Sequence, residues 1–408
     1  MRVLQLHTRY RQPGGEDAVV AAEAAMLRAA GHEVQALTAQ NPSGARAGLG
    51  ALALSSWNPA ARRSAERVAR DLRPDVAHVH NTWYAMSPSV LAGLSAAGVP
   101  VVTTLHNYRL ACANALLYRD GAPCTDCVGA SPWQGVRHRC YRGSVLQSAA
   151  AASNIALHGA AGTWAAHVRV FLALTEFARA TFVAAGLPSS AILVRPNATA
   201  DPGPRSTPPS ASRTVLWVGR LVPEKGVDIL LEAWRHRAHP PDLDGDVNRE
   251  LELVIVGDGP QRGALERAAP PRVRLIGAQP PERVRDLLLA ARALVFPSRW
   301  YEGQPMAVLE ALAAGVPVLA ADLGGLAETV APVGRRWLLP PGDAAAWARG
   351  LALLADGAEV DAAGARARRV YEQRHTPRGA VASLEHAYAL AIARSTAVRR
   401  PADRARPR

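Results

Sequence analysis

Two glutamates eight positions apart, Glu302 and Glu310, are the side chains in this sequence whose types and spacing point most clearly to chemistry. Glu302 lies in a loop after an apolar strand-like run, and Glu310 lies on the predicted helix that follows. The helical neighbours of Glu310 are apolar, so its carboxylate requires a hydrogen-bonding partner. Adjacent hydroxyls of a sugar or a ribose suit such a carboxylate. The alternatives are a salt bridge from Glu310 to an arginine and a solvated loop position for Glu302.

The loop that carries Glu302 is predicted to end in the start of a helix. Pro305 suits the first helical position, and Gly315 and Pro317 stop the helix about three turns later. The backbone amides at a helix start attract anions, because they have no acceptor within the helix. The residues expected to bind an anionic ligand here are Gly303, Gln304, Pro305 and Met306.

A second strand–turn–helix segment, residues 214–237, adds the cations Arg220 and Lys225. Lys225 is the only lysine among 47 basic residues. Two fixed cations suit a diphosphate leaving group, which carries two negative charges. The alternative is an ordinary charged turn at the surface.

Several separated motifs of this half resemble the retaining glycosyltransferases of family 4, which have the GT-B fold. The motifs are the Glu302–Glu310 spacing, Gly219-Arg220 with Glu224-Lys225-Gly226, Gly257-Asp258-Gly259-Pro260, and residues 315–328. The resemblance implies that Glu302 contacts the donor sugar and Glu310 the nucleoside ribose, with Arg220 and Lys225 at the diphosphate. It also implies donor contacts at Gly219, Gly324 and Gly325.

The first half of the chain contains weaker signals that the resemblance strengthens. Gly14 and Gly15 precede a predicted helix, where a structural turn is an equal reading; the resemblance implies a place over the donor phosphates. His106 ends a predicted strand, and the resemblance implies a place near the transferred sugar. The residues expected on the acceptor side are His80, Asn81, Tyr108 and Arg109.

A long excursion, residues 108–143, contains all four cysteines. Cys124 and Cys127 have the spacing of zinc ligands, and Cys112 and Cys140 flank them. A structural zinc ion is one reading, and free thiols in a reducing compartment or a redox pair are the others. We expect the excursion to shape the acceptor site.

The order of elements predicts an α/β protein in which two Rossmann-like doubly wound domains face each other across a cleft, and the resemblance implies that this is the GT-B fold. Apolar β-branched runs alternate with helical stretches in both halves. The expected parts are an acceptor-side domain over 1–199, a proline-rich linker over 200–212, and a donor-binding domain over 213–375. A helix over 376–394 is expected to pack back on the first domain, and a basic tail over 395–408 to be disordered.

The net charge of +13 attracts anions, but no block of basic and aromatic residues indicates a nucleic-acid site. No apolar stretch has the length of a membrane span, and the N-terminus lacks the pattern of a signal peptide. We therefore expect a cytoplasmic protein, whose basic tail is either solvated or adheres to the anionic inner face of a membrane.

Two further motifs are similar to those of other protein classes, and we do not expect either to have that function here. Asp242-x-Asp244 mimics the metal motif of another glycosyltransferase fold but lies in a proline-rich loop. Gly257-x-Gly259 mimics a dinucleotide fingerprint but lacks its third glycine and its acidic residue.

We expect transfer of a sugar from a UDP- or GDP-linked donor to a glycan, a lipid-linked acceptor or a small molecule, with no cofactor required for catalysis. The resemblance implies that the anomeric configuration is retained. A sugar-nucleotide epimerase or hydrolase and a non-catalytic sugar-nucleotide-binding scaffold are the alternatives.

Overall fold

The computed structural model describes residues 1–10, 14–41, 50, 52–237 and 250–403. Contacts divide the chain into two compact units. Unit 1 comprises Met1–Leu117, Thr125–Arg195 and Ala380–Arg408, and unit 2 comprises Tyr118–Cys124 and Pro196–Gly379. Each unit contains a six-stranded parallel sheet, which confirms the predicted α/β class with two Rossmann-like folds.

The sheet of unit 1 has the strand order β2-β1-β3-β4-β7-β8. The short apolar runs of the sequence form these strands, because a parallel sheet covered on both faces needs near-continuous apolar residues. The strands are β1 (Arg2–Arg9), β2 (Glu33–Gln40), β3 (Val76–Val79), β4 (Val101–Leu105), β7 (Val170–Ala173) and β8 (Ile192–Val194).

Three helices of unit 1 begin after a residue whose side chain accepts from a free backbone amide. The Asn58 side chain accepts from the amides of Ala60 and Ala61, and Pro59 then starts α3. The helices are α1 (Gly15–Ala29), α3 (Pro59–Leu72), α4 (Ser89–Ala96), α5 (Gln134–Arg137), α6 (Val145–Ala160), α7 (Thr163–His167), α8 (Glu176–Ala184) and α17 (Pro377–Asp403).

Helix α17 is longer than the sequence predicts. It runs from Pro377 to Asp403, so the backbone stays helical past Arg394, where disorder was expected to follow. Its residues Leu384, Ala387, Tyr388 and Ala391 are fully buried in the core of unit 1.

The sheet of unit 2 has the order β11-β10-β9-β12-β13-β14. Its strands are β9 (Thr214–Val218), β10 (Glu252–Val256), β11 (Val273–Leu275), β12 (Ala293–Phe296), β13 (Val318–Ala321) and β14 (Leu338–Leu339). The antiparallel pair β5 (Tyr118–Arg119) and β6 (Ala122–Pro123) also clusters with this unit.

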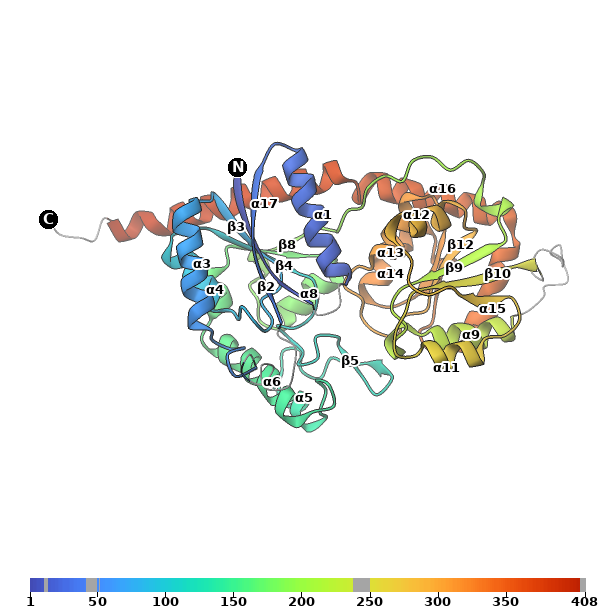
Figure 1. Ribbon diagram of the computed structural model, residues 1–408, viewed down its shortest axis with the longest axis horizontal. Coiled ribbons are helices and arrows are strands. Elements are labelled where there is room, and N and C mark those ends of the chain that lie inside the picture. The colour runs from blue at the N-terminus through green and yellow to red at the C-terminus, as the bar shows by residue number, and fades with distance from the viewer. Residues whose placement is uncertain (11–13, 42–49, 51, 238–249, 404–408) are drawn as a thin grey trace. The chain divides into compact units, whose positions relative to one another are not determined.

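Helices cover both faces of the second sheet (Figure 1). On one face lie α9 (Val227–Arg235), α11 (Arg262–Ala268) and α15 (Ala344–Gly350). On the other lie α12 (Pro281–Leu289), α13 (Met306–Ala313), α14 (Gly324–Val330) and α16 (Gly357–Arg374).

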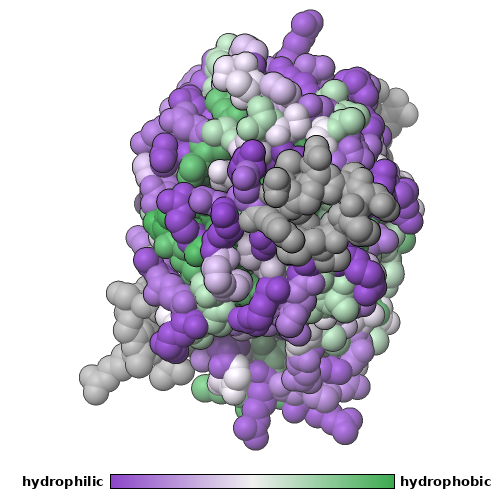
Figure 2. Space-filling model, turned by 90° about the vertical axis from the view of Figure 1, so that its right-hand side faces the viewer, coloured by the Kyte–Doolittle hydropathy of each residue, from purple (hydrophilic) through white to green (hydrophobic). Residues whose placement is uncertain are grey.

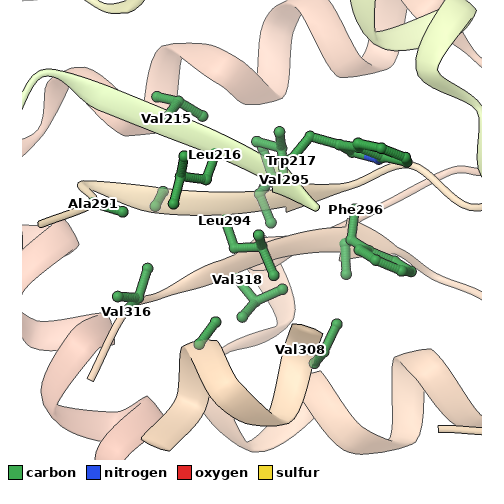
Figure 3. Close-up of a cluster of buried hydrophobic side chains, with 14 of the residues drawn as sticks. Val215, Leu216, Trp217, Ala291, Leu294, Val295, Phe296, Val308, Val316 and Val318 are labelled. Atoms are coloured by element: carbon green, nitrogen blue, oxygen red, sulfur yellow. The ribbon is translucent and has the colours of Figure 1, made fainter. Parts of the chain in front are cut away.

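The core of unit 2 consists of strand side chains and four tryptophans. Figure 3 shows Val215, Leu216 and Trp217 of β9 beside Leu294 and Phe296 of β12, and all of them are at most 2% exposed. The buried indoles are Trp217, Trp234, Trp337 and Trp347. Large apolar rings give most of the burial energy in such a core, about 1.5–3 kcal/mol each for a fully buried side chain.

The outer surface has a different composition. On the face that Figure 2 presents, hydrophilic side chains predominate and the hydrophobic areas are small and separate. None of the described helices combines the length and the apolarity that crossing a bilayer requires.

Candidate functional site

The strand order of unit 2 reverses between its two central strands. From β9 the chain goes on to β10 and β11 on one side, and β12 then pairs with β9 on the other side. Ligands of doubly wound sheets bind where two such loops diverge at the carboxyl ends of the strands. The loops at this point carry Lys225 and Glu302.

The two loops are held together by their backbones. The Arg299 amide donates to the Glu224 carbonyl at 2.8 Å, and the Ser298 hydroxyl oxygen lies 3.4 Å from the same carbonyl oxygen. Gly226 has a φ of 69°, and a Cβ there would lie 2.1 Å from the Pro297 carbonyl oxygen. Only glycine fits this position, so Gly226, directly after Lys225, is the residue that allows the two loops to approach each other.

Glu302 is the centre of the hydrogen bonding in these loops. One carboxylate oxygen, Oε1, accepts from Lys225 Nζ at 2.7 Å, from the Ser298 hydroxyl at 2.7 Å and from Trp300 Nε1 at 2.8 Å. No described residue donates to the other oxygen, Oε2. The side chain is 4% exposed, so its orientation is fixed and one oxygen remains for a ligand.

Lys225 is buried to a similar extent. Its side chain is 14% exposed and forms an ion pair with Glu302. The ammonium also lies 5.2 Å from the centre of the Phe296 ring and 5.5 Å from that of Trp300. Charges in such a setting are screened little by solvent, so this cation acts strongly on a nearby anion.

Glu310 lies on α13 and has a different environment. Burial raises the pKa of its carboxyl. No residue in the described part of the chain forms an ion pair or a side-chain hydrogen bond with it, so the salt bridge considered from the sequence is not formed there. A half-buried carboxylate without a protein partner is costly, and a pair of ligand hydroxyls would remove that cost.

Helix α13 begins one residue later than predicted, at Met306, and Pro305 is its cap residue. Pro305 has extended backbone angles, and its carbonyl accepts the first bond of the helix, from the Val308 amide at 3.1 Å. No described residue accepts from the amides of Gly303 and Met306. These amides are therefore available to an anion at the helix start.

Gln304 has a structural use. It is 9% exposed, and its Oε1 accepts from the Asn197 amide at 2.6 Å while its Nε2 lies 3.4 Å from the Thr329 hydroxyl. Both ends of the side chain are engaged, so only its backbone amide is left for the donor contact predicted from the sequence.

Arg220 follows β9 and is exposed, with no ion pair to any described residue. Its loop is held by the Gly257–Gly259 turn, which contacts it closely: a Cβ on Gly257 would lie 1.7 Å from the Gly219 carbonyl oxygen. This close packing explains the Gly-x-Gly pattern without a dinucleotide. Gly324 begins α14 with a φ of 52°, and Gly325 is buried beside it.

In unit 1, His106 follows β4 and contacts His80, which follows β3. His106 Nε2 lies 3.0 Å from His80 Nδ1, and the rings are stacked with centres 5.3 Å apart. Burial lowers the pKa of His106 to about 3 and that of His80 well below its usual value. Both imidazoles are therefore neutral at physiological pH.

Gly14 and Gly15 begin α1 without a local reason for glycine. Neither has a positive φ, and a Cβ at either would meet nothing within 4 Å. The Asp17 carboxylate holds this turn by accepting from the Gly14 amide at 2.9 Å, and it also contacts His7 Nε2 at 2.8 Å. The open space over the glycines is consistent with close approach of a ligand.

Glu16 is a polar residue at this edge that the sequence analysis missed. It accepts from the Tyr10 hydroxyl at 2.8 Å and from Asn107 Nδ2 at 3.3 Å. Burial, together with the Asp17 carboxylate, raises the pKa of Glu16 to about 7, against the opposing effect of these hydrogen bonds. Its place directly after Gly15 is the signal that could have revealed it, as Ser298 and Trp300 could have been found from their place beside Glu302.

Three of the four residues expected on the acceptor side have structural contacts. Asn81 is buried and joins the Thr8 carbonyl to the Trp83 amide. Tyr108 is 1% exposed and stacks on Phe182. The guanidinium of Arg109 lies between the rings of Trp83 and Tyr141, at 5.0 and 4.7 Å, and donates to the Ala113 carbonyl. These contacts within the protein account for the three residues, so no contact with an acceptor substrate is needed to explain them.

None of the four cysteines forms a disulfide bond, and among the described residues no three of them lie close enough together to hold a metal ion. Among the described residues, the group of potential ligands that lie within 4.8 Å of one another is Glu23, His78 and His80. The zinc site therefore stays a prediction. The Asp242-x-Asp244 motif lies outside the described residues.

The sequence matches two known families, one over each half. Residues 13–200 match the family described as "Glycosyltransferase Family 4", and residues 212–356 match "Glycosyl transferases group 1". These matches show that both halves of the sequence are similar to glycosyltransferases, and the two doubly wound sheets agree with the GT-B fold.

Individual relatives agree with this class. The chain is 31% identical over 308 residues to the 2-deoxystreptamine N-acetyl-D-glucosaminyltransferase of Streptomyces fradiae, covering 72% of this chain and 66% of that protein. It is 36% identical over 165 residues to the D-inositol 3-phosphate glycosyltransferase of Nocardia farcinica, covering 38% and 35%. The chain spans between 27% and 66% of the length of the first curated relatives that it matches.

Among solved structures, the fold is similar to that of Anabaena HepE in complex with UDP-glucose, with a TM-score of 0.65 over 95% of this chain and 98% of that one. The sequences are 18% identical, so this similarity concerns the fold.

Replacing Gly15 by alanine tests whether the open space at the start of α1 is used by a ligand. We expect Gly15→Ala to fold and to be as stable as wild type or up to about 1 kcal/mol more stable, because alanine favours helix. Binding of a nucleotide sugar, measured by calorimetry, should weaken. Gly159→Ala, at an equally open position in α6, is the matched control and should leave binding unchanged. Unchanged binding in Gly15→Ala would remove this glycine from the site.

The raised pKa of Glu16 predicts a pH dependence of stability. The folded chain holds the proton of Glu16 up to about pH 7, whereas the unfolded chain loses it near pH 4.5. The contribution of this proton to the free energy of unfolding is therefore complete below pH 4.5, and it is lost as the pH rises through 7. Glu16→Gln should remove this pH dependence of the free energy of unfolding, which amounts to up to about 3 kcal/mol over this range. Urea unfolding from pH 4.5 to 8 measures it, with the exposed Glu33→Gln as control. Identical slopes in wild type and Glu16→Gln would contradict the assignment.

Proposed function

We propose that this chain transfers a sugar from a nucleoside diphosphate sugar to a hydroxyl group of an acceptor, with retention at the anomeric carbon, as in the family 4 glycosyltransferases that it resembles. The observation that carries the proposal is the pair of carboxylates at the switch point of unit 2. Glu302 is fixed by three donors on one oxygen, and Glu310 is half-buried without a described partner. Both are built to accept hydrogen bonds from a polyhydroxylated ligand.

The cations near this pair are the groups that would bind the diphosphate. Lys225 is held in place by Glu302 and two aromatic rings, and Arg220 is exposed in the same loop without an ion pair to a described residue. The amides of Gly303 and Met306 at the start of α13 add partial positive charge. Together these groups stabilise the negative charge that develops on the leaving diphosphate, so the scheme needs no metal cofactor.

Glu310 is the group that would bind the ribose. Burial is the cause that raises the pKa of its carboxyl, and no described cation offsets the cost of burying the charge. Two adjacent ribose hydroxyls would donate to its two oxygens and restore the hydrogen bonds lost on burial. This role is independent of the base, so UDP- and GDP-linked donors both fit.

Glu302 would bind the transferred sugar through Oε2, the oxygen to which no described residue donates. Lys225, Ser298 and Trp300 donate to the other oxygen and fix the carboxylate in one orientation, so that Oε2 is left for a sugar hydroxyl. Because Lys225 contacts both Glu302 and the proposed diphosphate position, it would link the sugar to its leaving group.

The reaction breaks the bond between the anomeric carbon and a diphosphate oxygen and forms a bond from that carbon to the acceptor oxygen. With attack from the same face, the acceptor proton passes to the departing diphosphate, which serves as the base. No enzyme nucleophile is then needed, and the configuration is retained. In unit 1, His106 would hydrogen-bond a hydroxyl of the transferred sugar, and Gly14 and Gly15 would admit the donor phosphates.

The acceptor belongs to the polyhydroxylated compounds, whether a glycan, a lipid-linked sugar or a small molecule. Two relatives support this range, because one is named for 2-deoxystreptamine and the other for D-inositol 3-phosphate. A basic C-terminal segment would favour an acceptor at an anionic membrane surface.

Substitution of the paired groups tests the donor site. We expect Lys225→Met and Glu302→Gln to lower kcat/KM for transfer about 10²–10³-fold, the usual cost of losing one charge-stabilising group. Glu310→Gln should raise the KM for the donor about tenfold, because one strong hydrogen bond to the ribose weakens. The exposed Glu282→Gln is the control for glutamate replacement, and circular dichroism checks folding. Wild-type rates in both Lys225→Met and Glu302→Gln would overturn the site.

The donor is found by a thermal-shift panel of nucleotide sugars, since a ligand that binds only the folded chain raises its melting temperature. Incubation with the donor alone then separates the rival activities. A transferase consumes little donor without acceptor, whereas an epimerase or hydrolase consumes it fully, and a non-catalytic scaffold binds it without turnover.

A further inference from the structure

A chain of buried polar groups lies beneath the carboxyl edge of the unit 1 sheet. Glu23 of α1 and His78 of β3 are 0% exposed, Arg195 after β8 is 2% exposed, and His80 is 7% exposed. Glu23 lies in the middle of the apolar stripe of α1, between the buried Val20 and Leu27. A carboxylate there opposes the pattern of its own helix, so its contacts are expected to explain it.

Glu23 is a carboxylate held by a guanidinium. Its Oε2 lies 2.8 Å from Arg195 Nη1, and its Oε1 lies 2.9 Å from His78 Nδ1 and accepts from Gln5 Nε2 at 3.3 Å. Burial opposes the charge, but His78, Arg195 and His80 together hold the pKa of Glu23 well below its usual range.

The carboxylate of Glu23 faces the buried Nε2 atom of His80, which forms no hydrogen bond with a described residue. His80 Nε2 lies 3.4 Å from Glu23 Oε1. At this separation the negative charge favours an N–H over a lone pair on the facing nitrogen. Neutral His80 then carries its lone pair on Nδ1, the atom that faces His106. His7, whose ring centre is 6.3 Å away, is engaged with Asp17 and leaves this arrangement unchanged.

The same logic determines the proton of His106. Since His80 Nδ1 is an acceptor, His106 Nε2 must be the donor of the 3.0 Å hydrogen bond between them. Neutral His106 therefore has its lone pair on Nδ1, to which no described residue donates. The half-buried ring presents a hydrogen-bond acceptor outward.

We propose that Glu23, anchored by Arg195, acts through His80 to fix His106 as the Nε2–H tautomer, so that His106 Nδ1 accepts a hydrogen bond from a hydroxyl of the transferred sugar. Glu23, Arg195 and His80 are positioning residues in this scheme, and His106 is the residue that touches the ligand. The second half of the proposal rests on the function proposed above, whereas the tautomer itself is independent of it.

A metal ion bound by Glu23, His78 and His80 is the competing explanation, because these residue types also ligate metals. Two observations oppose it. Both nitrogens of His78 already have partners, with Nδ1 2.8 Å from the Tyr388 hydroxyl and Nε2 2.7 Å from the Thr104 hydroxyl. In addition, the guanidinium of Arg195 contacts Glu23 and would repel a second cation.

The test is nitrogen NMR of the full chain labelled with ¹⁵N-histidine, which distinguishes protonated from unprotonated ring nitrogens. The His106 signals are identified by their loss in His106→Gln. We expect wild type to show a protonated Nε2 and an unprotonated Nδ1. In Glu23→Gln both nitrogens should shift towards the average of the two tautomers, and the donor KM should rise about tenfold, the equivalent of one misdirected hydrogen bond. The exposed Glu33→Gln should change neither.

A second variant keeps the test decisive if Glu23→Gln does not fold. His80→Phe retains a ring between His78 and His106 but removes both nitrogens, and it should also mix the His106 tautomers. A wild-type His106 protonated on Nδ1, or an unchanged tautomer in the folded variants, would overturn the proposal. So would one metal ion per chain that disappears in His78→Gln.

The two proposals fail separately. If the tautomer is as expected but His106→Gln transfers sugar at the wild-type rate, the sugar contact is wrong and the positioning of the proton stands. If Lys225→Met and Glu302→Gln retain full activity, the donor site is wrong whatever the tautomer of His106.

Discussion

The ion pair between Lys225 and Glu302 is the interaction on which the arrangement of the second unit depends. Two charges with 14% and 4% exposure lose most of their hydration, and such a pair is tolerated only when further hydrogen bonds and close geometry compensate it. Ser298 and Trp300 supply those bonds, and Gly226 allows the loops to approach. The pair therefore fixes both the loops and the free oxygen of Glu302.

A similar constraint applies to the first unit. Glu23 interrupts the apolar stripe of α1, and it is compensated by Arg195 and by the imidazoles of β3. In both units most strand residues are apolar, because parallel strands covered on both faces leave little place for charges. Buried polar residues within the strands, such as Gln5 and His78, have hydrogen-bonding partners, and Lys225 and Glu302 lie in loops after strands.

Much of this could be predicted from the sequence by local physics. The run Ala293–Phe296 is apolar and β-branched, and it forms β12 with the predicted bounds. The helix of Glu310 was also predicted, with its start displaced by one residue because a proline serves equally as a cap residue and as a first helical residue. The C-terminal helix was predicted too short, because the proline at position 401 and the basic residues around it are typical of a disordered tail.

The sequence by itself determined the class of fold, the two carboxylates and the cations that could act with them, because spacing along strands and helices is a local property. Only the tertiary structure decided the partners. It paired Lys225 with Glu302 and left Glu310 without a described partner. It also used Asn81, Tyr108 and Gln304 for packing and brought Glu23 to His80. These residues are far apart along the chain, so their contacts follow from strand order and loop approach, which local sequence patterns do not encode.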